Sequence, residues 1–130
     1  MPEIIVTPQS LVQTTNGKRF YAYSGQIGVD NTQQWQMIDV DNIGERDILM
    51  KLEMGSAETT TVDFTIRVLI NSVVVYIDTI NNAGEQSMAG YNELKFICPA
   101  NASLAIEVIS NSTSSRTLTI MAHGKYLSID

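Results

Sequence analysis

The densest group of potential metal ligands is the acidic segment DVDNIGERD, which runs from Asp39 to Asp47. Asp39, Asp41 and Gly44 match the first, third and sixth positions of an EF-hand calcium loop. The match then fails, because the twelfth position, where such a loop needs a bidentate Glu, is Met50. A looser calcium site with Asp39 and Asp41 as ligands stays open, and the alternative is an acidic turn at the rim of a β-domain. We otherwise expect no metal and no cofactor.

His123 is the single histidine, so a multi-histidine metal site is excluded. No Ser or Cys motif pairs with it as a nucleophile, and active sites consist of pairs or triads of groups. The single cysteine, Cys98, forms no intramolecular disulfide and lies in the apolar run LKFICP, where we expect a small buried thiol. We therefore expect that the protein is not an enzyme, and in particular not a histidine-rich cupin.

The aromatic residues offer a third kind of chemistry. Tyr21 and Tyr23 share one face of an expected strand, and aromatic rings on a β-sandwich can stack against the apolar faces of sugar rings. Trp35 is the only tryptophan and the other tyrosines are dispersed, which favours packing roles. A carbohydrate-binding β-sandwich module or a receptor-binding tip domain is therefore the alternative function.

The charge balance bears on the partners of the protein. The chain has 8 Lys and Arg against 14 Asp and Glu, which gives a net charge of −6. Binding to nucleic acid depends on basic residues that displace counterions, and here they are scattered along the chain. An acidic surface is also repelled by anionic membranes, and no apolar run reaches the roughly 20 residues that span a bilayer. We expect neither nucleic acid nor a membrane as partner.

The elements that must position these residues are strands. Apolar runs of five to ten residues alternate with Gly, Asn, Ser and Pro clusters, and period-2 alternation places Phe64, Ile66, Val68 and Ile70 on one face. About eight strands and no helix are expected: an all-β, two-sheet antiparallel β-sandwich, with an eight-stranded jelly roll favoured. An immunoglobulin-like sandwich is the rival, but its Cys…Trp…Cys spacing is missing.

Two local features of these strands are also predicted. Gly25 and Gly28 indicate a bulge or a close backbone approach within the strand candidate Lys18 to Val29. Asn71 and Ser72 separate two apolar runs and are expected to form a two-residue hairpin turn.

The chain divides into residues 1–17, an N-terminal arm or first strand, and residues 18–130, the β-sandwich domain. The arm carries the apolar run Ile4, Ile5 and Val6 between two prolines. We hold two interpretations open: the arm adds a strand to the sheet of a neighbour, or it is the first strand of its own sandwich.

The segment VVVYIDTI is apolar on both faces, whereas a two-sheet sandwich buries one face of each strand. We expect Val73, Val75 and Ile77 to face the core and Val74, Tyr76 and Ile80 to face a partner. The outward Met121 and the apolar residues of the arm are further candidates. The candidate interface residues are Ile4, Ile5, Val6, Val74, Tyr76, Ile80 and Met121. This pattern predicts a homo-oligomer or a protein docked on a larger assembly.

The hairpin VDFTIRVLINSVVVYIDTI, the segment FICPANASLAIEVISNSTSS and the closing LTIMAHGKYL resemble the small jelly-roll decoration (cement) proteins of tailed bacteriophage capsids. The resemblance extends over roughly residues 19–127 and consists of strand pattern and turn style. It implies a structural virion protein, made in the host cytoplasm, that binds the outer surface of a phage head. It further implies an oligomer, with a trimer favoured, that ties neighbouring subunits of the major capsid protein together. It transfers no catalytic or ligand residue.

Overall fold

The computed structural model describes residues 5–6, 12–15, 19–55, 62–80 and 93–127, which form eleven strands and no helix. Within these ranges no helix is available to span a bilayer. The strands are β1 (Ile5–Val6), β2 (Val12–Thr15), β3 (Arg19–Tyr23), β4 (Ile27–Val29), β5 (Gln34–Val40), β6 (Ile48–Gly55), β7 (Phe64–Ile70), β8 (Val73–Ile80), β9 (Glu93–Cys98), β10 (Leu104–Ser110) and β11 (Arg116–Tyr126).

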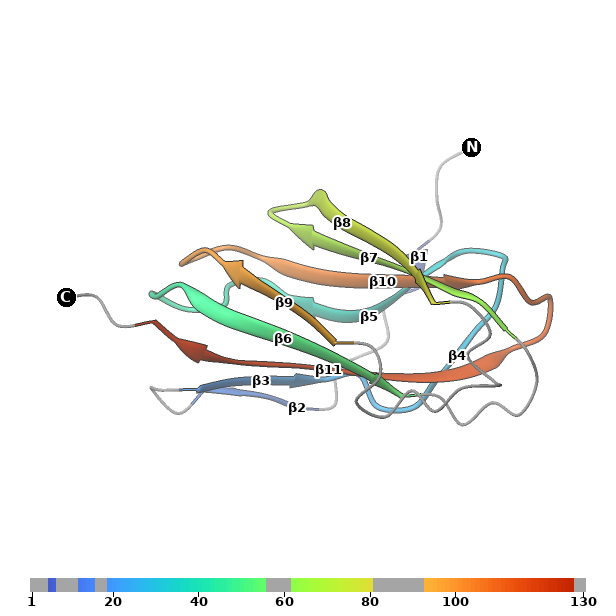
Figure 1. Ribbon diagram of the computed structural model, residues 1–130, viewed down its shortest axis with the longest axis horizontal. Coiled ribbons are helices and arrows are strands. Elements are labelled where there is room, and N and C mark those ends of the chain that lie inside the picture. Colours follow the sequence, from blue (N-terminus) through green and yellow to red (C-terminus); the bar gives the residue numbers. More distant parts are fainter. Residues whose placement is uncertain (1–4, 7–11, 16–18, 56–61, 81–92, 128–130) are drawn as a thin grey trace.

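The strands form two sheets that enclose one core. The first sheet has the order β1-β5-β10-β7-β8 and the second the order β2-β3-β11-β6-β9, with β4 paired to the first part of β11. Figure 1 shows the β7–β8 hairpin at one margin of the molecule and β2 and β3 at the other. All pairings are antiparallel except that of β1 with β5.

The strand order confirms the jelly roll. Leaving out β1, β2 and β4, the remaining eight strands pair as β3 with β11, β5 with β10, β6 with β9 and β7 with β8. These are the nested pairs of one long hairpin, and wrapping that hairpin produces two four-stranded sheets, as in a jelly roll. Eleven strands are present instead of about eight because the arm contributes β1 and β2, and because the segment Lys18 to Val29 is divided into β3 and β4.

The division between β3 and β4 occurs at Gly25, as the two glycines predict. Gly25 has φ +73°, a conformation that glycine adopts without a steric penalty. Just before it, the Ser24 hydroxyl accepts a hydrogen bond from the backbone N–H of Ile120 at 2.9 Å, which ties the end of β3 to β11. Gly28 faces Ser115 so closely that a Cβ would collide with the Ser115 hydroxyl. A side chain at Gly28 would therefore require the Ser115 hydroxyl to rotate away.

The core consists of inward-facing residues from both sheets, and the predicted alternation is confirmed in β6 and β7. Ile48, Met50, Leu52 and Met54 are buried, whereas Leu49 lies exposed on the opposite face of β6. In β7, Phe64, Ile66 and Val68 are buried and Ile70 packs against the core from its margin.

Cys98 is buried at the end of β9, as expected for a free thiol in an apolar run. Desolvation, followed by the nearby charge of Asp47, raises the pKa of Cys98 to about 11. Because the thiolate is the reactive form, this cysteine is a packing residue in the native state.

The N-terminal arm pairs with its own sandwich where the structure describes it. Ile5 and Val6 lie parallel to Gln34 and Trp35 of β5, and β2 lies antiparallel to β3. This pairing corresponds to the interpretation of the arm as a strand of its own sandwich. The third apolar arm residue, Ile4, lies outside the described residues.

The predicted hairpin turn between β7 and β8 is confirmed. Asn71 and Ser72 have φ values of +52° and +65°, the two positive values of a type I′ turn. The Asn71 side chain also accepts a hydrogen bond from the backbone N–H of Ser103 at 3.0 Å, which fixes the hairpin to the start of β10. The turn therefore places β8 in a defined register on β7.

We predict that Ser72→Gly raises the free energy of unfolding by about 0.5–1 kcal/mol. A left-handed backbone costs an L-residue about 1–2 kcal/mol, and glycine avoids this cost while losing somewhat more chain entropy on folding. Chemical denaturation of both proteins measures the difference. Ser114→Gly is the matched control, because Ser114 lies in an exposed turn without a positive φ and should lose stability. Equal destabilisation by both changes would contradict the turn assignment.

Candidate functional site

β8 is the edge strand of its sheet and exposes apolar side chains along its length. Val73, Val75 and Ile77 are 61%, 53% and 61% exposed, and Tyr76 is 39% exposed. An edge strand also presents unpaired backbone N–H and C=O groups, and monomers usually protect such an edge with charges or prolines. β8 carries one charge, Asp78, and no proline. Its exposed apolar residues Val73, Val75, Tyr76 and Ile77 are called the β8 edge below.

The predicted faces of β8 were wrong, and a β-bulge is the reason. Val68 lies opposite Tyr76, but Leu69 lies opposite Val74, so Val75 is an extra residue in the ladder. Tyr76 and Ile80 consequently share the inner face with Val68 and Phe64, whereas Ile77 lies on the outer face opposite Arg67.

Two expectations about β8 are corrected. Ile80, a predicted interface residue, is 5% exposed and belongs to the core. Val75 and Ile77, predicted to be core residues, are instead exposed. Val73, also predicted in the core, lies opposite Ile70 but is exposed next to the hairpin turn. Of the other predicted interface residues, Val74 is half-buried and Tyr76 is exposed.

An apolar cleft of about 530 Å³ lies between β8 and β9, the edge strands of the two sheets. It is lined by Val68, Ile70, Val75, Tyr76, Leu94, Lys95, Phe96, Ile97 and Pro99. Desolvation, followed by the charge of Asp78, raises the pKa of Tyr76 at its mouth. The β8 edge thus continues into the sandwich as an open cleft with mainly apolar walls.

The outer face beside the β8 edge carries a buried ion pair. Glu107 of β10 is 2% exposed, and its carboxylate lies 3.5 Å from Nε of Arg67 on β7. Arg67 is the residue opposite Ile77 in the ladder. A buried pair of this kind depends on both partners, because removing one leaves an uncompensated charge. Arg67 and Glu107 are therefore structural supports of the sheet that presents β8.

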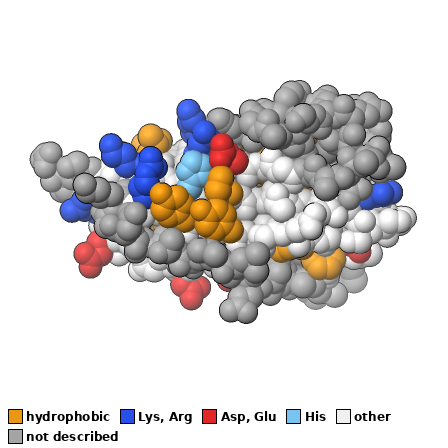
Figure 2. All heavy atoms as spheres, turned by 90° about the horizontal axis from the view of Figure 1, so that it is seen from below, with side chains coloured by type: hydrophobic (Ala, Val, Ile, Leu, Met, Phe, Trp, Pro, Cys, Tyr) orange, Lys and Arg blue, Asp and Glu red, His pale blue; other side chains and the backbone are white. Residues whose placement is uncertain are grey.

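A second surface lies on the outer face of the other sheet. His123 of β11 lies opposite Tyr21 of β3 and Lys51 of β6, and in the next row Met121 lies opposite Tyr23 and Glu53. These six residues are called the Tyr–His face below. Figure 2 shows hydrophobic side chains beside the single histidine, with basic and acidic side chains next to them. Met121, a predicted interface residue, is half-buried here on β11, in the opposite sheet from β8.

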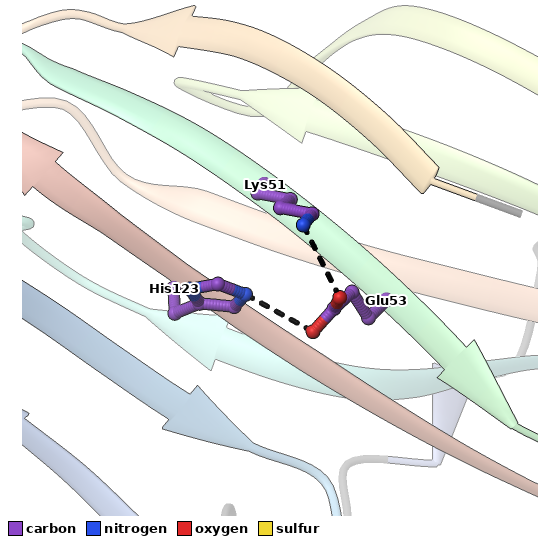
Figure 3. Close-up of polar contacts among 3 residues, drawn as sticks. All are labelled: Lys51, Glu53 and His123. Carbon is purple, nitrogen blue, oxygen red and sulfur yellow. Dashed lines mark hydrogen bonds and ion pairs between the residues drawn. The ribbon is translucent and has the colours of Figure 1, made fainter. Parts of the chain in front are cut away.

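Three side chains of the Tyr–His face form a polar chain, shown in Figure 3. His123 Nε2 lies 3.1 Å from Glu53 Oε2, and Lys51 Nζ lies 3.3 Å from Glu53 Oε1. Burial raises the pKa of Glu53, but the hydrogen bonds and charges of His123 and Lys51 outweigh it, so that this pKa lies below its ordinary value. Glu53 is therefore an ionised acceptor held in place by two donors.

The tyrosines beside this polar chain are aligned. The rings of Tyr21 and Tyr23 are nearly parallel, with an interplanar angle of 13° and centroids 6.5 Å apart. The two residues share a face, as the sequence predicts, because they are two positions apart on one strand.

The basic residues are scattered in the sequence, but the fold gathers half of them here. Arg19, Lys51, Lys95 and Lys125 all lie on the outer face of β3, β6, β9 and β11, as their cross-strand partners require. Glu53 is also on this face, and the β6–β9 register places Glu93 opposite it, so four basic positions stand against two acidic ones. The face is therefore basic, although the chain has a net charge of −6.

Asp39 and Asp41 lie exposed at the end of β5. Desolvation, followed by the charge of Asp41, raises the pKa of Asp39. Within the described residues, no group of three or more His, Cys, Asp or Glu is placed to hold a metal ion. Calcium binding by Asp39 and Asp41 stays a prediction.

Sequence reasoning missed two parts of these surfaces. The partner of His123 is Glu53, 70 positions away, and only the β6–β11 register brings the two together. The outward alternation of Lys51 and Glu53 in ILMKLEMG was visible, but it does not identify the neighbouring strand. The exposure of Ile77 depends on the bulge, for which the sequence of β8 carries no glycine or proline signal.

Fold and surfaces together define the class: an all-β jelly-roll sandwich with an exposed apolar edge strand and a basic aromatic sheet face. No family model and no curated protein matches the chain.

Several solved structures show a distant likeness. A chain of the crystal structure of accessory secretory proteins 1, 2 and 3 from Streptococcus pneumoniae is 11% identical with a TM-score of 0.37, over 86% of this chain and 87% of that chain. The infectious bursal disease virus VP2 subviral particle is 10% identical with a TM-score of 0.33, over 90% of this chain and 36% of that chain. The Schizosaccharomyces pombe Cnp3 cupin domain is 10% identical with a TM-score of 0.26, over 90% of this chain and 62% of that chain. At these TM-scores the likenesses carry no argument about function.

Proposed function

We propose that the protein is a structural component of a virion, a decoration (cement) protein that binds the outer surface of a phage head. The major capsid protein is its partner in this proposal, and the protein acts as a homo-oligomer, with a trimer favoured. The single observation that carries the proposal is the β8 edge. An exposed edge strand with apolar side chains on both faces is costly in an isolated monomer and useful in an interface.

The geometry around the β8 edge supports a contact surface. Val75 and Tyr76 belong both to this edge and to the apolar cleft between β8 and β9, so one partner segment can bury strand and cleft together. Aromatic and aliphatic anchors that fill a pocket are the usual centre of a protein interface. The net charge of −6 further suits the outside of a shell whose interior holds nucleic acid.

Titration of purified heads tests the proposal. The protein is added to heads of the virus that encodes it, from which decoration protein has been removed, and the bound amount is measured by sedimentation and located by cryo-electron microscopy. We expect saturation at a fixed ratio to the major capsid protein, with density on the outer surface. Light scattering on the free protein measures its oligomer. Failure to bind such heads would overturn the capsid role and leave the fold unaffected.

A further inference from the structure

A shallow hollow of about 390 Å³ adjoins the Tyr–His face. Its rim includes Tyr23, Met121 and Glu53. The residues that line the hollow next to this rim are small. They are Gly25, which follows β3, Thr119 on β11, and Gly55 on β6, which lies opposite Thr119. Since Gly25 and Gly55 have no side chains, the outer face of the sheet is depressed where they lie. The hollow therefore follows from the sequence of three neighbouring strands.

The groups at the hollow match the needs of a sugar ring. Small-molecule sites combine apolar walls with a few fixed polar groups. Tyr23 and Met121 supply apolar surface, and Tyr21 extends the aromatic surface along β3 with a nearly parallel ring. Glu53 is held at the rim by His123 and Lys51, at 3.1 and 3.3 Å, so its orientation is set before a ligand arrives.

Charge selects the class of sugar. Arg19, Lys51, Lys95 and Lys125 are on the same sheet face and outnumber its two acidic positions, Glu53 and, by register, Glu93. Clustered positive charge raises the local concentration of anions, and the effect weakens as salt is added. A neutral sugar would gain only the stacking on Tyr23. An acidic sugar would gain this stacking and also the attraction of its carboxylate to the basic side chains.

We propose that the Tyr–His face and its hollow bind an acidic saccharide, a pyranose that carries a carboxylate, with one ring face against Tyr23 and the carboxylate toward the lysines. The site belongs to the opposite sheet from the β8 edge and does not depend on the proposed capsid role. A decoration protein with this site would present a glycan-binding surface on the particle.

Titration of the full chain with trigalacturonate, followed by NMR chemical shifts or calorimetry, tests this inference. The methyl ester of the same trisaccharide is the neutral probe. We expect saturable binding of the acid, at least about tenfold weaker binding of the ester, and weaker binding of the acid at higher salt.

Two variants locate the site. Tyr23→Ala should weaken binding by about three- to tenfold, the usual range for one lost aromatic contact. Gly55→Phe should abolish binding by filling the hollow, because among the described residues a Cβ at Gly55 meets Thr119 Oγ1 alone, at an ordinary 3.4 Å. Tyr76→Ala, which removes an exposed tyrosine from the other sheet, is the matched control and should leave binding unchanged. Absence of saturable binding by the wild-type chain, or binding that Tyr23→Ala and Gly55→Phe leave intact, would overturn the inference.

Discussion

Replacing Ile77 with lysine should weaken the proposed binding to phage heads by at least about 30-fold while leaving the fold intact. Central apolar anchors of an interface contribute 2 kcal/mol or more, which corresponds to that factor. In addition, the ammonium group of the new lysine would lose its water on binding without gaining an opposite charge. Binding is measured by the capsid titration described above, and stability by chemical denaturation.

The same substitution should lower the free energy of unfolding by no more than about 1 kcal/mol. Ile77 is 61% exposed, so little packing is lost, but the new lysine lies opposite Arg67 in the ladder and like charges in such a pair repel. Val75→Lys, at the bulge and in the cleft, should act in the same way. A folded variant that no longer binds would therefore report the loss of a contact.

Leu49→Lys is the matched control for the β8 edge. Leu49 is also exposed, at 47%, but it lies on β6 in the opposite sheet. Capsid binding should survive this change. If Leu49→Lys abolished binding and Ile77→Lys did not, the contact surface would be the other sheet, and the assignment to β8 would be wrong.

Much of the fold could be predicted because the strands obey local rules. Period-2 alternation identified the inner faces of β6 and β7, since each of these strands has one buried and one exposed side. Asn71 and Ser72 marked the hairpin turn because few residues tolerate positive φ. The two-sheet sandwich then follows from the number of strands that each need one covered face.

The surfaces could not be predicted to the same extent, because they depend on contacts between distant strands. A single extra residue at Val75 exchanges the faces of β8, and alternation alone cannot locate it. The polar chain of His123, Glu53 and Lys51 requires that β6 and β11 be neighbours in a particular register. Sequence identified Tyr21 and Tyr23 as a pair because both belong to one strand.

Gly124 shows how a residue without a sequence signal can control the fold. It lies in the middle of the second sheet, between Phe20 of β3 and Met50 of β6, and it is buried. A Cβ at this position would collide with the carbonyl oxygen of Leu49 and would lie 2.5 Å from Cγ2 of Ile48. The carbonyl is backbone in a paired central strand, so it cannot move aside without disturbing the β6–β11 ladder.

We therefore predict that Gly124→Ala lowers the free energy of unfolding by about 3 kcal/mol, at the upper end of the usual cost of overpacking. For a chain of 130 residues this corresponds to a decrease in Tm of about 10 °C. Calorimetry or thermal denaturation followed by circular dichroism measures the decrease.

Gly55→Ala is the matched control on the neighbouring strand. Gly55 also lies in β6–β11 pairing, but a Cβ there meets Thr119 Oγ1 at 3.4 Å, which is ordinary contact. Alanine should then stabilise the strand by up to about 1 kcal/mol, because it loses less chain entropy than glycine. A Gly124→Ala variant as stable as Gly55→Ala would mean that β6 and β11 do not approach as closely as the ladder requires, and the register that joins His123 to Glu53 would have to be revised with it.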